Sequence, residues 1–518
     1  MKRIFAILIT ICLLAGALSI STSAALLSEL DAVPVGTVLR VSALKKTASD
    51  KLETQVLKDF VSFQDGWNYA MEIAGDDDEM DDNEYERIVV DLLADWKANE
   101  KGEFVGSDGE GFENNTIYIP QEAKVMLNMN GHTIDRGLGD NNKYDGEVIC
   151  IDSEADVIIN GGKNGDAIAR ADDEKATVQF GTITGGNSDT GAGGIHIQDE
   201  ANVMLNNVNI FANITDDDDG AGIAIYDGAS LVMNGGGFID NENHSDTIFS
   251  AGHGAAIYIY DSTARFNKVL FRNNQYTDKA SSGAAVYVDS GSVTMEDCLV
   301  ADNGIWDETN GAKGSHSTIY ATKSNLELKN TTFTGNGSAQ MNGGDDKCDV
   351  IYLYYTPLLI DTCIFTGNRA NDDIIDGMYN YGIPSIVNST FTGNDGQVIF
   401  ATKTIFTNCT FNDNNKINPD MYDFSPFYPA GESTVFTMVD CDMGDSTYSS
   451  PERIKLVDSE AENGAEFPGS IFGEGSLTMI IAFIALVASI ASIVVNVCNS
   501  NKAKKLVLAE TNETKEDN

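Results

Sequence analysis

Four residues in the first half of the chain have side chains suited to acid–base chemistry on a sugar: Asp189, Asp218, Asp219 and His253. Two carboxyl groups hydrolyse a glycosidic bond with inversion when they flank it about 6.5 to 9.5 Å apart. Neighbouring strands of a repeating β-structure supply separations of that order, because each strand adds about 4.8 Å. These four residues are therefore the candidate catalytic set, and the candidate reaction is polysaccharide hydrolysis.

The motifs around these residues resemble, in chain order, the NTD, DD, GHG and RIK elements of polygalacturonases. They are Asn187-Ser188-Asp189, Asp218-Asp219, Gly252-His253-Gly254 and Arg453-Ile454-Lys455. The resemblance implies a hydrolase of acidic polysaccharides. However, the last motif follows the third by about 200 residues, whereas one site must gather its groups from one or two coils. Catalysis is therefore kept as the alternative function.

A second candidate set is aromatic and consists of Tyr258, Tyr287, Tyr320 and Tyr352. Each tyrosine stands at the same outward position of a repeated unit, so the four are expected to form a stripe. Rigid tyrosines lose little entropy on contact and present both a ring and a hydroxyl, which favours a binding face. Tyrosines also pair well across strands, so a stacking ladder without a ligand is the competing interpretation.

These residues are positioned by an internal repeat of about 30 residues. One unit places Ile319, Leu326, Leu328, Thr331, Phe333 and Asn336 at offsets 0, 7, 9, 12, 14 and 17. Units that begin at Ile257, Val286 and Ile351 share these offsets, and those at Ile195 and Ile223 fit after one extra residue. Pairs of apolar residues two apart indicate short strands with one buried face. Because polar turns too short for a helix separate the pairs, the repeat predicts stacked coils with parallel sheets.

The repeat combines a glycine-rich element, such as Gly193-Gly194-Ile195, with an FxxN element, such as Phe333/Asn336. This combination resembles the polymorphic outer-membrane protein repeat of chlamydial adhesins, within the right-handed parallel β-helix, pectin-lyase-like superfamily. The resemblance covers roughly residues 117–445 and implies a surface-exposed protein of the adhesion type. That family ends in an outer-membrane β-barrel, whereas this chain is expected to end in a single apolar helix.

The expected fold is all-β: a right-handed parallel β-helix of about ten coils with a short N-terminal helical cap and a C-terminal transmembrane helix. In the cap we expect a helix over 65–74, an acidic loop over 76–82 and a strand over 87–93. The expected boundaries are a signal peptide at 1–24, the cap region at 25–115, the β-helix at 116–446, a juxtamembrane linker at 447–476, the transmembrane helix at 477–497 and a cytoplasmic tail at 498–518.

The two ends predict the location of the chain. Lys2 and Arg3 precede an apolar run and then small residues, as in a secretory signal. The segment 477–497 carries no charge and is long enough to span a bilayer as a helix. Lysines follow it, which places the tail inside the cell. We therefore expect a single-pass cell-membrane protein whose bulk is extracellular.

Composition limits the partners. The 518 residues carry a formal net charge of −46, which excludes nucleic-acid binding as the default and offers no basic cleft for an anionic sugar. Cysteines such as Cys298 and Cys363 fall in an interior column of the repeat, and Cys409 and Cys441 are close enough there to form a disulfide. The expected function is that of an adhesin-like surface binding protein for a host or cell-surface protein or glycan, without cofactor or metal. A polysaccharide-active enzyme and a passive envelope stalk remain the alternatives.

Overall fold

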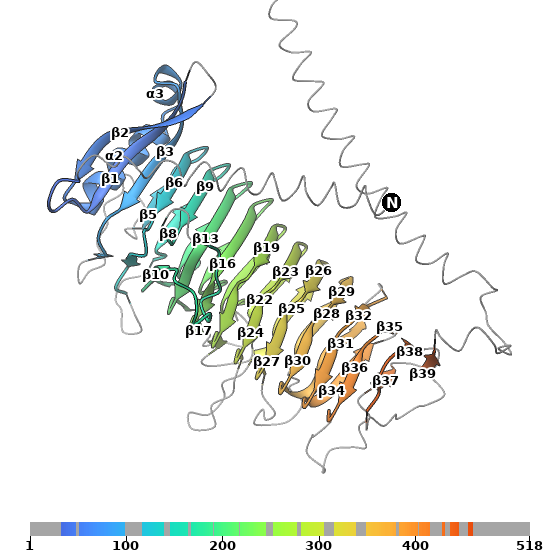
Figure 1. Cartoon of the computed structure of the whole chain (residues 1–518). Helices are drawn as coiled ribbons and strands as arrows, with labels where there is room; N and C mark the ends of the chain where they lie inside the picture. The colour runs from blue at the N-terminus through green and yellow to red at the C-terminus, as the bar shows by residue number, and fades with distance from the viewer. Residues whose placement is uncertain are drawn as a thin grey trace, which may run out of the picture. The chain divides into compact units, whose positions relative to one another are not determined.

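The computed structural model describes most of the chain between residues 33 and 458 (Figure 1). The described ranges are 33–47, 51–98, 116–138, 146–163, 167–189, 191–216, 218–244, 252–276, 281–304, 315–337, 349–379, 383–401, 403–414, 427–429, 436–444 and 454–458.

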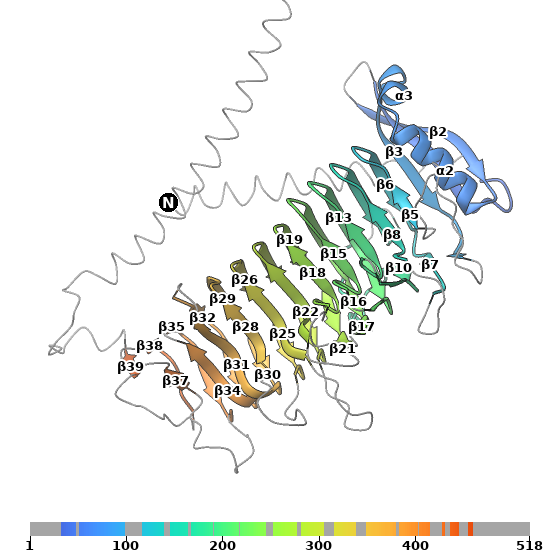
Figure 2. The ribbon, with the colours of Figure 1, turned by 180° about the vertical axis from the view of Figure 1, so that it is seen from behind.

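The fold is all-β, and its strands return repeatedly to the same long parallel sheets. The sheet that carries the tyrosines has 11 strands, each paired in parallel with the next one in chain order (Figure 2). These strands are β5 (Ile117–Ile119), β8 (Ile149–Ile151), β12 (Ile195–Ile197), β15 (Ile223–Ile225), β18 (Ile257–Tyr260), β22 (Ser281–Asp289), β25 (Ser315–Thr322), β28 (Asp349–Tyr354), β31 (Arg369–Tyr379), β34 (Asp395–Ala401) and β37 (Phe427–Pro429).

A second sheet has 24 strands, and most of them lie in two parallel rows that meet in β13 and β16. The first row is β3 (Tyr85–Leu92), β6 (Lys124–Asn128), β9 (Asp156–Asn160), β13 (Asn202–Phe211), β16 (Ser230–Ile239), β19 (Thr263–Asn267), β23 (Ser292–Glu296), β26 (Asn325–Lys329), β29 (Leu358–Asp361), β32 (Ser385–Val387), β35 (Thr404–Thr407), β38 (Phe436–Val439) and β39 (Ile454–Val457). The second row adds β4 (Trp96–Lys97), β7 (Thr133–Asp135), β10 (Gly181–Thr184), β20 (Leu270–Arg272), β24 (Leu299–Ala301), β27 (Thr332–Thr334), β30 (Ile364–Thr366), β33 (Thr390–Thr392) and β36 (Thr410–Asn412). A small third sheet consists of β11 (Asn187–Ser188), β14 (Ile214–Asp216), β17 (Glu242–His244) and β21 (Gln275–Tyr276).

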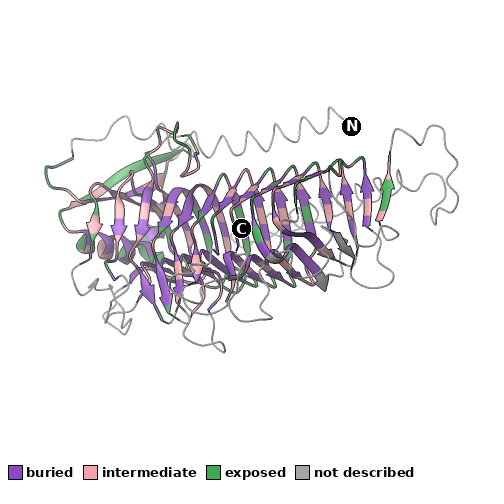
Figure 3. Ribbon diagram, turned by 90° about the horizontal axis from the view of Figure 1, so that it is seen from below, coloured by how far each residue is buried: buried purple, intermediate pink, exposed green. Residues whose placement is uncertain are grey.

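The register confirms the repeat offsets. Ile319 pairs with Ile351 in the tyrosine sheet, and Phe333 pairs with Phe365 in the second row of the large sheet. Equivalent residues therefore stack into columns, as expected of stacked coils. Buried and partly buried residues alternate along many strands, because one face of each strand lies in the core (Figure 3).

The core is built from these columns. Phe333, Phe365 and Phe391 stack with ring centroids 4.7 Å apart at each step. Cys298 and Cys363 are buried in the expected interior column. Cys409 and Cys441 are free thiols joined by a hydrogen bond, and no disulfide links them.

A column of buried asparagines runs beside the phenylalanines. In each, the side-chain amide donates both to a backbone carbonyl and to the side-chain oxygen of the next asparagine, as Asn303 does to Phe271 at 3.0 Å and to Asn336 at 3.0 Å. These asparagines satisfy backbone groups that the turns leave unpaired. Members with this bond to the next asparagine are Asn213, Asn241, Asn274, Asn303, Asn336, Asn368 and Asn394.

The N-terminal cap contains the helices α2 (Phe63–Ala74) and α3 (Asp77–Asp82) and the hairpin of β1 (Leu39–Lys46) and β2 (Leu52–Phe60). Helix α2 confirms the expected helix, and β3 confirms the expected strand. The expected loop over 76–82 is wrong, because that segment forms α3. Asp76 caps this helix by accepting a hydrogen bond from the Glu79 N–H at 3.0 Å. The acidic side chains in the first turn stabilise the helix further, because they lie at the positive end of its dipole.

The expected signal peptide and transmembrane helix lie outside the described residues. Within the described ranges, no helix has the length and apolar character needed to cross a membrane.

Candidate functional site

The candidate site follows one column of the tyrosine sheet, which we call the outer column. Register pairing aligns its members from strand to strand. Flanking residues such as Ile257 and Ile259 belong to the main core, whereas Tyr258 and Ala224 form a separate small cluster outside it. The outer column therefore lies on the opposite face of the sheet from the core. Its members are Tyr118, Cys150, His196, Ala224, Tyr258, Tyr287, Tyr320, Tyr352, Asp376, Phe400 and Tyr428.

The four tyrosines stack ring on ring. Centroids are 5.3 Å apart between Tyr258 and Tyr287, 4.9 Å between Tyr287 and Tyr320, and 4.8 Å between Tyr320 and Tyr352, with interplanar angles of 20° or less. Tyr258 is only 9% exposed, less than expected for an outward residue, because the rings of its neighbours cover it. The other three are partly exposed. Since neighbouring rings occupy each other's faces, solvent reaches the ring edges.

Asp218, Asp219 and His253 gather beside the start of this stack. Asp219 Oδ1 accepts from the backbone N–H of His253 at 2.7 Å, and the Asp219 carboxyl also hydrogen-bonds the side chain of Tyr258. Asp218 Oδ1 accepts from the backbone N–H of Asp219 at 2.7 Å. Gly252 permits this close approach, because a Cβ there would collide with the carbonyl oxygen of Asp218. The structure thus gives a physical reason for a glycine beside the histidine.

Burial shifts the ionisation of all three side chains. It raises the pKa of Asp219 to about 7, with the Asp218 charge adding to the effect and the His253 N–H opposing it. Burial also raises the pKa of Asp218, and Asp189 lies close enough to add to that rise. The pKa of His253 falls to about 4 through burial. A carboxyl group with a pKa near 7 exchanges protons at neutral pH and so suits general acid–base catalysis.

The last of the polygalacturonase-like motifs, which includes Lys455, does not join the site of Asp218 and Asp219. Lys455 lies in β39, and eight successive pairings separate that strand from β16 in the coil of Asp218 and Asp219. At about 4.8 Å per strand the separation is roughly 40 Å, so Lys455 does not share their site. Arg453 lies outside the described residues.

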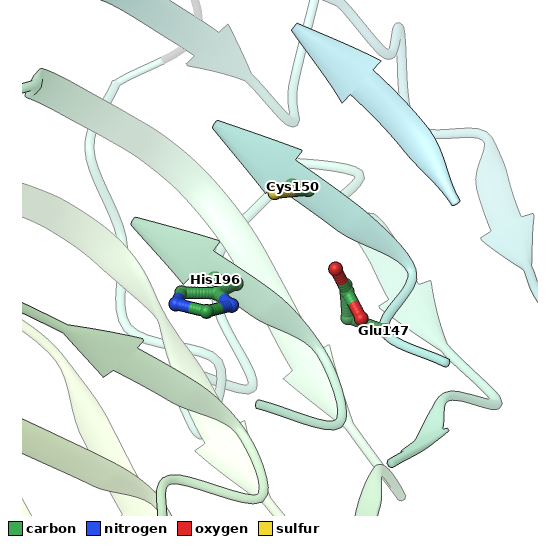
Figure 4. A group of neighbouring side chains, drawn as sticks. All are labelled: Glu147, Cys150 and His196. Carbon is green, nitrogen blue, oxygen red and sulfur yellow. The ribbon is translucent and has the colours of Figure 1, made fainter. Parts of the chain in front are cut away.

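Among the described residues, two clusters hold side chains with the composition of metal ligands. Glu147, Cys150 and His196 bring one ligand atom each to within 4.8 Å of one another (Figure 4). Burial raises the pKa of the Cys150 thiol well above its usual range, and the charges of Glu147 and Asp152 add to that rise.

The second cluster consists of the buried aspartates Asp349, Asp373 and Asp376, whose carboxylates also lie within 4.8 Å of one another. Asp376 follows Tyr352 in the outer column. Clusters of carboxylate oxygens are typical ligands of hard cations such as Ca²⁺.

Sequence reasoning missed several members of the outer column. The position of Cys150 was available by extending the column of His196 back by one coil, because both follow an isoleucine that starts a strand. Two residues beside the column carried no such signal, since both lie outside the strands of the tyrosine sheet. They are Glu147, which lies near Cys150 and His196, and Tyr226, whose ring contacts those of His196 and Tyr258.

Comparison of the chain with protein-family models, with curated proteins and with solved structures found no match.

Proposed function

We propose that the chain is a right-handed parallel β-helix surface protein, related to the pectin-lyase-like superfamily and anchored by its C-terminal helix, that binds a protein on an opposing surface. The observation that carries the binding proposal is the stack of Tyr287, Tyr320 and Tyr352 on the outer face of a regular sheet. A flat, rigid row of aromatic residues offers contact area with little loss of entropy.

The environment of the stack favours a basic protein over a sugar chain. Sugars stack on the open faces of aromatic rings, but here neighbouring tyrosines cover those faces and leave the edges. The Asp289 carboxylate contributes to the raised pKa of Tyr287 and Tyr320, so negative charge lies next to the stack. The formal net charge of −46 adds a long-range attraction for a cationic partner. Lysine and arginine side chains are therefore the expected contacts.

The double variant Tyr287→Ser/Tyr320→Ser tests this proposal. Aromatic side chains at the centre of an interface are common energetic anchors, so we expect a loss of about 2 kcal/mol or more, roughly a 30-fold weaker affinity. The measurement is binding of the full-length protein to an array of basic peptides and cell-surface proteins, with a glycan array beside it.

A matched control is Met204→Ser/Leu359→Ser, which alters two side chains on the large sheet that are 38% and 37% exposed. The control should bind like the parent. If the tyrosine variant also binds like the parent, the stack is only a structural ladder.

A second candidate function is glycoside hydrolysis, favoured by the raised pKa of Asp219 beside a second carboxyl group, Asp218. In this proposal Asp219 is the general acid that protonates the leaving oxygen, and Asp218 is the base that activates water. His253 positions Asp219 through its backbone N–H.

The enzyme proposal predicts that the full-length chain releases reducing ends from a polysaccharide panel that includes uronate polymers. Asp219→Asn should lower that rate by about 100-fold or more, since a positioned general acid contributes on the order of 10² to 10⁴. The exposed Asp261→Asn is the control and should keep the parent rate. Absence of reducing ends from every polymer would remove this candidate.

A further inference from the structure

We propose that Glu147, Cys150 and His196 form a site for a divalent transition-metal ion, with Zn²⁺ as the expected occupant. Cys150 lies on β8, His196 on the neighbouring β12, and Glu147 on the segment that leads into β8 (Figure 4). The proposal does not require the tyrosine stack to bind a partner or Asp219 to act in catalysis.

The ligand chemistry selects the class of metal. A thiolate, an imidazole and a carboxylate are ligands that Zn²⁺ takes at about 2.0 to 2.3 Å, whereas Ca²⁺ and Mg²⁺ prefer oxygen alone. Tetrahedral coordination at those lengths places ligand atoms about 3.3 to 3.8 Å from one another. The ligand atoms here already lie within 4.8 Å of one another, so small side-chain rotations complete the set. Three protein ligands leave one position for a water molecule, as in catalytic zinc sites.

The backbone holds the ligands in place before any metal binds. Cys150 and His196 are register partners on adjacent parallel strands, so the sheet fixes their spacing. The carbonyl oxygen of Glu147 accepts from Arg136 Nε at 3.3 Å and from Thr116 Oγ1 at 3.4 Å. Sites built on rigid elements lose little entropy when they close around an ion.

Neighbouring groups support a bound cation. Gln198 Nε2 donates to Cys150 Sγ at 3.7 Å and thereby orients the thiol. Burial lowers the pKa of His196, and the nearby negative charges of Glu147, Asp218 and Asp199 oppose that fall. This concentration of negative charge favours an ion of charge +2 over an empty site.

Cobalt substitution tests the site, because a Co²⁺–thiolate bond gives a charge-transfer absorption that oxygen and nitrogen ligands do not. The full-length protein, stripped with a chelator, is titrated with Co²⁺ and then with Zn²⁺. We expect one equivalent per chain, a thiolate band, and displacement of Co²⁺ by Zn²⁺. Cys150→Ser should abolish the band, and Glu147→Gln and His196→Gln should each weaken binding at least tenfold.

Cys363→Ser and Asp349→Asn are the controls, one a buried interior thiol and the other a member of the acidic cluster. Both should keep the band and the affinity of the parent. The proposal is overturned if the parent shows no thiolate band, if the band persists in Cys150→Ser, or if both Glu147→Gln and His196→Gln bind like the parent. The last two variants decide the question if Cys150→Ser does not fold.

Discussion

Replacing Asn303 with alanine is expected to lower the free energy of unfolding by about 3 to 5 kcal/mol. Its side-chain oxygen accepts from the backbone N–H of Asn274 at 3.1 Å and from the Asn274 amide at 2.8 Å. Its own amide donates to Phe271 and to Asn336. The amide also donates to the carbonyl oxygen of Ala301 at 3.0 Å. Alanine removes all five bonds and leaves polar groups in a fully buried column, where each unpaired group costs about 1 to 3 kcal/mol.

Urea unfolding of the purified full-length chain, followed by circular dichroism, measures this effect. The control is Asn325→Ala, because Asn325 is exposed and the variant should unfold within about 0.5 kcal/mol of the parent. Equal midpoints for the two variants would show that the asparagine column contributes little to stability.

Asp219→Asn is expected to stabilise the fold by about 4 kcal/mol at pH 8 and to change it little at pH 4. Burial raises the pKa of Asp219 from 3.8 to about 7, so between these values the folded chain holds a proton that the unfolded chain has lost. The free energy of unfolding therefore falls as pH rises through this window, by about 1.4 kcal/mol per unit. Asparagine cannot ionise and avoids that loss.

Unfolding midpoints of the parent and the variant at pH 4 and pH 8 measure the difference. Other groups interact with this carboxyl group through charge or hydrogen bonds, but they are present in both proteins. They are Asp218, His253, Tyr226, Tyr258 and Tyr287. Asp261→Asn, at an exposed position, should show no such dependence on pH. A constant difference between parent and Asp219→Asn at the two pH values would contradict the raised pKa. A carboxylate that destabilises the fold is also expected at a functional site, because activity often costs stability.

The sequence predicted the columns well because each repeat places its apolar residues at fixed offsets. Ile319 and Phe333 therefore met the expected partners in the next coil. The hairpin of β1 and β2 was missed, because its antiparallel strands lie before the repeat and share none of its spacing. Helix α3 was missed because a run of charged, solvated residues was taken to indicate a loop. The hydrogen bond from the Glu79 N–H to the Asp76 side chain instead caps a helix there.

The candidate site was predicted in part for the same reason. The tyrosine stack follows from register alone, and the meeting of Asp219 with His253 follows from adjacent coils. Glu147 could not be predicted, since it lies in a segment outside the strands. Arg136 and Thr116 hold this segment in place by donating hydrogen bonds to the carbonyl oxygen of Glu147. Contacts of this kind leave no periodic trace in a sequence.

The hairpin in the cap limits how copies of the chain can polymerise. The open end of a parallel sheet exposes unpaired backbone groups, and a strand of a further copy can pair with them. Here β1 takes the place next to β3 and runs antiparallel to it, and β2 closes the other side of β1. The outermost strand, β2, carries Glu53, Lys58 and Asp59, and charged edge strands resist the addition of another strand. Strand addition at this edge of the large sheet is therefore disfavoured, so copies of the chain at high concentration can stay as separate molecules.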